Sequence, residues 1–188
     1  MHTKKVKLFV FSAPSGSGKT TIVKSVLLKH SDFVFSVSAT TRKPRNSEKD
    51  GKDYFFISEE EFKEKIRNNE FIEYEKVYDY YYGTLKDFVE KSIAGGHSVV
   101  FEVDVKGALS IKQKYPEAVL IFIVPPSIEE LKKRLLDRKT ETTQELKKRI
   151  ERAEMELSYK DKFDYVVSNE NLEEAKKKVY EIINKEIN

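Results

Sequence analysis

The sequence predicts an α/β fold in which a parallel sheet flanked by helices forms the main body and two insertions interrupt it. Three observations support this class. Short apolar runs alternate with segments of helical periodicity, a Gly- and Ser-rich loop follows the first run, and two polar stretches break the alternation. Apolar runs without polar alternation are typical of strands covered on both faces, as in parallel sheets. The length of 188 residues fits one domain with insertions.

Four apolar runs are predicted to form the strands of this sheet: Leu8–Phe11, Val99–Val103, Val119–Val124 and Tyr165–Val167. Between and after these runs, apolar residues recur at helical spacing. This spacing predicts helices over Thr20–Lys29, Val105–Lys114, Ile128–Leu136, Gln144–Leu157 and Leu172–Ile183. The alternation of strands and helices indicates a doubly wound arrangement.

The two interruptions differ in character. The first, residues 35–84, is polar and rich in Tyr and Phe, with short β runs at Tyr54–Ile57 and Phe71–Tyr74 around a helical pattern at Glu59–Arg67. This pattern predicts a small inserted α+β subdomain. The second, residues 127–160, is almost entirely helical. The main body is then made of residues 1–34, 85–126 and 161–188.

The composition excludes several classes of site and partner. The chain has no Cys, so it holds no disulfide, no thiolate metal site and no Cys nucleophile. Its net charge of +3 is too small to indicate a nucleic-acid partner. No apolar segment reaches the ~18 residues that a membrane span needs. We therefore expect a cytoplasmic protein that binds neither membranes nor nucleic acids.

The loop after the first apolar run predicts a phosphate-binding site. It reads Ala13-Pro14-Ser15-Gly16-Ser17-Gly18-Lys19-Thr20, which matches the P-loop pattern G-x-x-x-x-G-K-[ST] except that Ala13 replaces the first Gly. Backbone N–H groups of such a loop converge on phosphate oxygens, and the following helix adds a favourable dipole. Lys19 would contact the β- and γ-phosphates, and Thr20 would offer a hydroxyl to Mg²⁺. A Gly/Ser turn that happens to precede a Lys is the alternative interpretation.

The first interruption carries a second phosphate-binding candidate. Only seven of the 35 basic residues are Arg, the side chain suited to two-pronged phosphate recognition. Arg42 and Arg45 lie three residues apart among Thr and Tyr hydroxyls, as recognition of a phosphate monoester requires. A solvated basic loop is the alternative, and the P-loop upstream argues against it.

With these motifs the chain resembles the guanylate kinase family, over roughly Leu8 to Ile183. Six short stretches carry the resemblance: Ser12–Thr20, Phe35–Arg45, Gly51–Phe56, Phe71–Glu73, Tyr81–Thr84 and Pro125–Ser127. The resemblance implies a CORE with the P-loop, an inserted GMP-binding subdomain and a helical LID. It also implies the reaction of ATP with GMP to give ADP and GDP, with Mg²⁺. We expect GMP as the small-molecule partner, with dGMP left open, and a monomer or a homodimer.

The resemblance implies a role for each site residue. The ATP side comprises Ala13, Pro14, Ser15, Gly16, Ser17, Gly18, Lys19, Thr20, Thr21, Arg134 and Asn169, the last near the adenine. The GMP side comprises Arg42, Arg45, Tyr54 and Tyr82 at the phosphate, Ser38, Glu73, Thr84 and Asp104 at the guanine, and Gly83 and Glu102. The catalytic charges are Lys19, Arg42, Arg138 and Arg149, and the Mg²⁺ ligands are Thr20 and Glu102. Arg152 has no counterpart in the resemblance and is predicted to be structural.

The chemistry of guanine supports the base-reading residues. Its edge offers N1–H and N2–H₂ donors beside the O6 acceptor, so Glu73 can accept from both donors and Ser38 can donate to O6. Adenine lacks these donors and would leave a buried carboxylate unpaired. A site built on hydrogen bonds can reject such an analogue by ~10⁴-fold.

Two alternatives from other classes stay open. A non-catalytic guanylate-kinase-like domain would bind peptides, but such domains typically have a degraded P-loop, whereas Lys19 and Thr20 are intact here. A kinase for UMP, CMP or dTMP is the second alternative, and the pair Glu73 and Ser38 argues against it.

Overall fold

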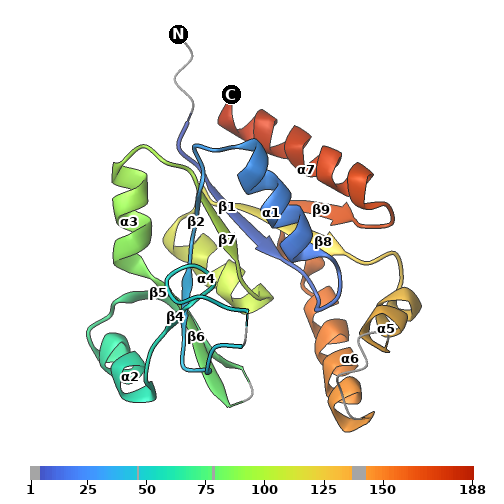
Figure 1. Ribbon diagram of the computed structural model, residues 1–188. Coiled ribbons are helices and arrows are strands. Elements are labelled where there is room, and N and C mark those ends of the chain that lie inside the picture. Colours follow the sequence, from blue (N-terminus) through green and yellow to red (C-terminus); the bar gives the residue numbers. More distant parts are fainter. Residues whose placement is uncertain (1–4, 46, 78, 137–142) are drawn as a thin grey trace.

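The main body is a five-stranded sheet in the order β2-β7-β1-β8-β9, in which every neighbouring pair is parallel (Figure 1). The computed structural model describes residues 5–45, 47–77, 79–136 and 143–188. Its large sheet confirms the four predicted strands and adds β2, a two-residue strand too short for a periodic signal. The strands are β1 (Leu8–Ser12), β2 (Val34–Phe35), β7 (Val99–Glu102), β8 (Val119–Val124) and β9 (Tyr165–Ser168).

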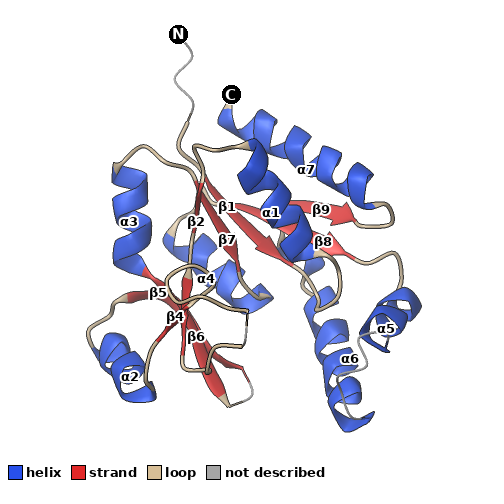
Figure 2. Cartoon of the chain, viewed as in Figure 1, coloured by secondary structure: helices blue, strands red, loops and turns tan. Residues whose placement is uncertain are grey.

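Both faces of this sheet are covered by helices, which explains the uninterrupted apolar runs (Figure 2). In β1, Phe9 and Phe11 belong to the core on one face, whereas Leu8 and Val10 belong to the core on the other. Successive side chains of a strand point to opposite faces, so every position must be apolar. The covering helices are α1 (Lys19–Lys29) and α7 (Leu172–Ile187) on one face, and α3 (Lys86–Ala94) and α4 (Val105–Lys114) on the other.

The first interruption forms its own four-stranded sheet in the order β4-β3-β6-β5, in which only the β3–β4 pair is parallel. Its core centres on Phe62, which is fully buried and stacks on Phe71 with ring centroids 4.4 Å apart. A Cβ on Gly83 would lie 2.8 Å from the Phe71 ring, so this position has no room for a side chain. The elements are β3 (Ser38–Thr40), β4 (Phe55–Phe56), α2 (Glu59–Arg67), β5 (Phe71–Val77) and β6 (Tyr80–Leu85).

The second interruption consists of α5 (Ile128–Leu136) and α6 (Thr143–Leu157), followed by a 3₁₀ turn at Lys160–Lys162. Leu131 of α5 and Ala153 of α6 are buried in one small apolar cluster. In Figure 1 these helices project from the main body on one side and the inserted subdomain projects on the other. All five helices predicted for the main body and the second interruption are confirmed, and α3 is an additional one. None of the described helices combines the length and the apolar composition needed to traverse a bilayer.

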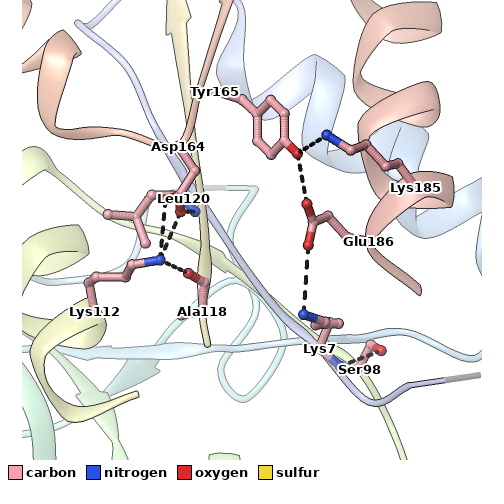
Figure 3. A network of polar contacts seen from close by, with 9 residues as sticks. All are labelled: Lys7, Ser98, Lys112, Ala118, Leu120, Asp164, Tyr165, Lys185 and Glu186. Carbon is pink, nitrogen blue, oxygen red and sulfur yellow. Dashed lines mark hydrogen bonds and ion pairs between the residues drawn. The ribbon is translucent and has the colours of Figure 1, made fainter. Parts of the chain in front are cut away.

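A network of polar contacts ties the amino ends of the strands to the surrounding helices (Figure 3). Asp164, just before β9, accepts a hydrogen bond from Lys112 Nζ of α4 at 3.0 Å. The Tyr165 hydroxyl donates to Glu186 of α7 at 2.7 Å, and Lys7 Nζ lies 3.6 Å from the same carboxylate. These contacts hold α4 and α7 on the sheet at the end away from the carboxyl ends of the strands, where ligands of open α/β sheets bind.

Candidate active site

Two glycines at positive φ shape the loop between β1 and α1. Gly16 has φ 92° and Gly18 has φ 85°, a region that other residues rarely adopt. Gly18 directly precedes α1, where no side chain caps the helix and no acidic residue occupies the first turn. The first N–H groups of α1 are therefore available to an anion, as a phosphate-binding helix terminus requires.

Asn169 anchors this loop from the end of β9. The residue is 6% exposed, and its Nδ2 donates to the carbonyl oxygen of Ser17 at 2.8 Å. A Cβ on Gly18 would lie 2.3 Å from the same nitrogen. Asn169 thus packs directly against the loop, and this contact adds a second role to its predicted place near a bound base.

The carboxyl end of β7 meets the start of α1. Lys19 Nζ donates to the carbonyl oxygen of Val103 at 3.1 Å, and Thr20 Oγ1 donates to Glu102 Oε1 at 2.6 Å. Among the described residues, no group of three or more His, Cys, Asp or Glu could hold a metal ion. The hydroxyl and carboxylate of Thr20 and Glu102 nevertheless fit Mg²⁺, which keeps several waters and takes one or two carboxylates together with phosphate oxygens.

A cavity of 860 Å³ extends from the P-loop to the inserted subdomain. Most of the predicted site residues line it, although they come from α1, β3, β5, β6, β7 and the connecting loops. They are Ala13, Pro14, Ser15, Gly16, Ser17, Gly18, Lys19, Thr20, Thr21, Ser38, Tyr54, Glu73, Tyr82, Gly83, Glu102 and Asp104. One continuous space therefore joins a phosphate-binding loop to a set of carboxylates.

Glu73 is the buried carboxylate of this cavity. It follows a register irregularity in β5 after Phe71, a feature that can re-aim a side chain. Thr84 Oγ1 donates to Glu73 Oε1 at 2.5 Å, and burial raises the pKa of Glu73 to about 7. A Cβ on Gly107 would lie 2.9 Å from Glu73 Oε2 and 3.3 Å from Asp104 Oδ1, so the two carboxylates converge there. A ligand that offers N–H donors would favour the ionised form of Glu73.

Arg42 forms a cationic corner beside two Tyr rings. Its guanidinium makes two hydrogen bonds to Glu48, at 2.8 and 2.9 Å, which hold the pKa of Glu48 at about 2. The backbone N–H of Arg45 donates to the same carboxylate at 2.7 Å, while the Arg45 residue is exposed. The guanidinium lies 5.4 Å from the Tyr54 ring centroid, and the Tyr54 ring packs edge-on against Tyr82. Forked donors next to hydroxyls suit a phosphate monoester.

Comparison with known proteins decides the family. The family described as guanylate kinase matches residues 5–186. This chain belongs to the guanylate kinase family. The guanylate kinase of Caldanaerobacter subterraneus subsp. tengcongensis is 51% identical over 180 residues, covering 96% of this chain and 87% of that protein. That of Thermotoga maritima is 50% identical over 182 residues, covering 97% and 88%. A crystal structure of guanylate kinase from Anaplasma phagocytophilum is 34% identical with a TM-score of 0.81, covering all of this chain and 89% of that one.

The cavity lining does not include five predicted site residues whose side chains the structure describes: Arg42, Arg45, Thr84, Arg149 and Asn169. Thr84 and Asn169 instead donate hydrogen bonds to Glu73 and to the carbonyl oxygen of Ser17, as described above. Arg149 of α6 donates a hydrogen bond to the Ser15 hydroxyl of the P-loop. Arg134 lies in α5, with its side chain outside the description, and Arg138 lies outside the described residues.

The guanylate kinase site also contains charged residues that the sequence analysis missed. Glu75 and Glu156 line the cavity, and burial together with nearby Asp104 raises the pKa of Glu75 to about 7. Arg152, predicted to be only structural, contacts the predicted guanine reader Asp104 at 3.0 Å. Alternation along a strand puts Glu73 and Glu75 on one face, and this spacing is the signal by which Glu75 could have been found. Spacings of three and seven residues likewise put Arg149, Arg152 and Glu156 on one helix face.

Replacing Asn169 with Ala is expected to raise the KM for ATP about tenfold, because the P-loop loses the donor that fixes the Ser17 carbonyl. Initial rates at varied ATP measure this change, and the KM for GMP should stay within about twofold. Asn184→Ala, on the exposed side of α7, is the matched control. An unchanged KM for ATP would contradict the anchoring role.

Proposed function

We propose that this chain transfers the γ-phosphoryl group of ATP to GMP, giving ADP and GDP, with Mg²⁺ as cofactor. The observation that carries the proposal is the single cavity that joins the P-loop to Glu73. A P-loop cradles a nucleoside triphosphate, and a buried carboxylate suits the N1–H and N2–H₂ donors of guanine. Relatives named guanylate kinase at 50–51% identity support the same reaction.

Phosphoryl transfer requires alignment and charge neutralisation rather than covalent chemistry by the protein. We assign Lys19 to the β- and γ-phosphates, Arg42 and Arg45 to the phosphate of GMP, and Arg138 and Arg149 to the transferring group. No general base is assigned, since a phosphate monoester with a second pKa near ~6 is largely ionised at neutral pH.

The hydroxyl of Thr20 and the carboxylate of Glu102, already 2.6 Å apart, would hold the Mg²⁺ ion. When bound, this ion would neutralise negative charge on the phosphates of ATP. Thr20 can keep donating its hydroxyl proton to Glu102 when the ion is bound, because a lone pair of its oxygen is still available to a cation.

We assign recognition of the base to Glu73, supported by Thr84, together with Ser38 and Asp104. Glu73 is buried, so an acceptor base that leaves it without donors incurs the desolvation of an unpaired carboxylate. Guanine satisfies it and adenine does not. The preference for GMP over AMP then follows from the unpaired group rather than from the size of the cavity.

The test is release of ADP, in a coupled assay with ATP and Mg²⁺, from a panel of GMP, dGMP, AMP, UMP, CMP and dTMP. We expect kcat/KM for GMP to exceed that for AMP by about 10³-fold or more. A pyrimidine monophosphate as the best acceptor would favour the alternative kinase. No turnover with any acceptor at millimolar concentration would favour the non-catalytic binding domain.

Replacing Arg42 with Met is expected to raise the KM for GMP about 30- to 100-fold, because a charge-assisted phosphate contact is lost. Steady-state kinetics at varied GMP measures the change, and the KM for ATP should stay within about threefold. Arg67→Met, at the exposed end of α2 in the same subdomain, is the control. If ATP affinity fell while the KM for GMP held, the subdomain assignment would be wrong.

We further propose a cytoplasmic location and a monomer or homodimer, as the sequence analysis expects. Sedimentation velocity at several protein concentrations distinguishes the two states.

A further inference from the structure

Arg152 lies where three parts of the chain meet. Its Nη2 donates to Asp104 Oδ2 at 3.0 Å, and its Nε donates to Glu156 Oε1 at 3.0 Å. The same Nη2 lies 4.0 Å from Glu75 Oε2. Arg152 and Glu156 belong to α6, Asp104 follows β7, and Glu75 belongs to β5 of the inserted subdomain. One guanidinium therefore connects the second interruption, the main body and the first interruption.

The charges around Arg152 are strongly unbalanced without it. Four carboxylates line the cavity near its base end: Glu73, Glu75, Asp104 and Glu156. Arg152 forms hydrogen bonds with Asp104 and Glu156 and lies 4.0 Å from Glu75. Lys106 Nζ lies 3.4 Å from Glu75 on the exposed side. If the guanidinium were removed, the ionised carboxylates among the four would repel one another, and Asp104 would lose its nearest cation.

Two hydrogen bonds and the neighbouring Glu75 carboxyl group hold Asp104 in place. Its Oδ1 accepts the N–H of Gly107 and so caps α4, at 2.8 Å. Its Oδ2 is held by Arg152, whose side chain is only 27% exposed. Asp104 Oδ1 and Glu73 Oε2 both lie close to the position that a Cβ on Gly107 would occupy. When both carboxylates are ionised they repel each other, and the hydrogen bond from Arg152 restrains Asp104 against this repulsion.

We propose that Arg152 is a positioning residue for the acceptor: it holds Asp104 beside Glu73 in the arrangement that receives the guanine base. This inference rests on the proposed function and adds a residue to it. Arg152 shares its helix face with Arg149, which contacts the P-loop hydroxyl of Ser15. The same face of α6 thus touches the donor and the acceptor ends of the cavity.

The experiment measures GMP affinity by isothermal titration calorimetry in the full chain, with Arg152→Met, Asp104→Asn and the double variant. Arg152→Met is expected to weaken GMP binding about tenfold in the parent and less than about threefold in the Asp104→Asn background, because it acts through Asp104. The KM for ATP should stay within about twofold. Lys106→Met, which removes the other cation beside Glu75, is the matched control and should leave GMP affinity unchanged.

Arg152→Lys keeps the positive charge but loses the planar, two-pronged guanidinium, so it should recover part of the GMP affinity. It also provides the test if Arg152→Met fails to fold. Equal GMP affinity in the parent and the Arg152 variants would overturn the inference. So would an equal loss in the Asp104→Asn background, which would mean that Arg152 acts elsewhere. A parent that neither binds nor phosphorylates GMP would instead remove the proposed function, so the two failures are distinguishable.

Discussion

Replacing Glu73 with Gln is expected to lower kcat/KM for GMP by about 10³-fold, the largest loss for any substitution on the acceptor side. The amide turns an N–H₂ donor toward guanine donors and removes one acceptor. Thr84 and the surrounding packing are left in place, because the two side chains have nearly the same shape. The KM for ATP should stay within about threefold, and equal losses for both substrates would contradict the base-reading role.

The same substitution is expected to stabilise the protein without ligand, by about 2 kcal/mol at pH 8. Burial raises the pKa of Glu73 from 4.5 to about 7, so the folded state binds a proton that the unfolded state has lost between these values. The parent therefore loses stability as the pH rises from about 5 to 8, and the Gln variant lacks this component. Urea unfolding at pH 5.5 and pH 8 measures both, and Glu60→Gln, exposed in α2, is the control. A Gln variant less stable than the parent at pH 8 would show that burial of the ionised Glu73 does not destabilise the folded state.

Replacing Lys19 with Met is expected to reduce kcat by about 10³-fold or more while GMP affinity stays within about twofold. Lys19 is the first residue of α1. Its ammonium group donates a hydrogen bond to the Val103 carbonyl oxygen at 3.1 Å, and both residues line the cavity. Charge that develops on the transferring group has no other fixed cation from the loop. Single-turnover rates with saturating ATP and GMP measure the loss, and Lys177→Met, on the exposed side of α7, is the control. Activity within tenfold of the parent would rule out the assigned role.

The main body could be predicted because its signals are local. The apolar runs become strands buried on both faces, and helices such as Val105–Lys114 begin and end where the spacing predicts. The loop from Ala13 to Thr20 could be predicted for the same reason, since its contacts to phosphate depend on consecutive backbone groups. Strands β3 and β6 could not, because their pairing joins residues about 40 positions apart and their composition is mixed.

The carboxylates around Glu73 show a second limit of sequence analysis. Glu75 and Glu156 look like solvated charges in the sequence, and only the packing of α4 on β5 and the path of α6 bring them to one cavity. Arg152 has no counterpart in the guanylate kinase resemblance, so the sequence predicts only a structural role for it. Its partner Asp104 lies 48 positions away, and no local pattern encodes such a contact.

The pairing of Arg42 with Glu48 has a consequence for how binding free energy is used. The guanidinium is already immobilised by two hydrogen bonds before an acceptor arrives, so its rotamer freedom is lost during folding rather than at each encounter. A clamp preorganised in this way loses less conformational entropy when it binds the phosphate. Glu48→Gln would then weaken GMP binding by loosening Arg42, even though the cation itself is still present.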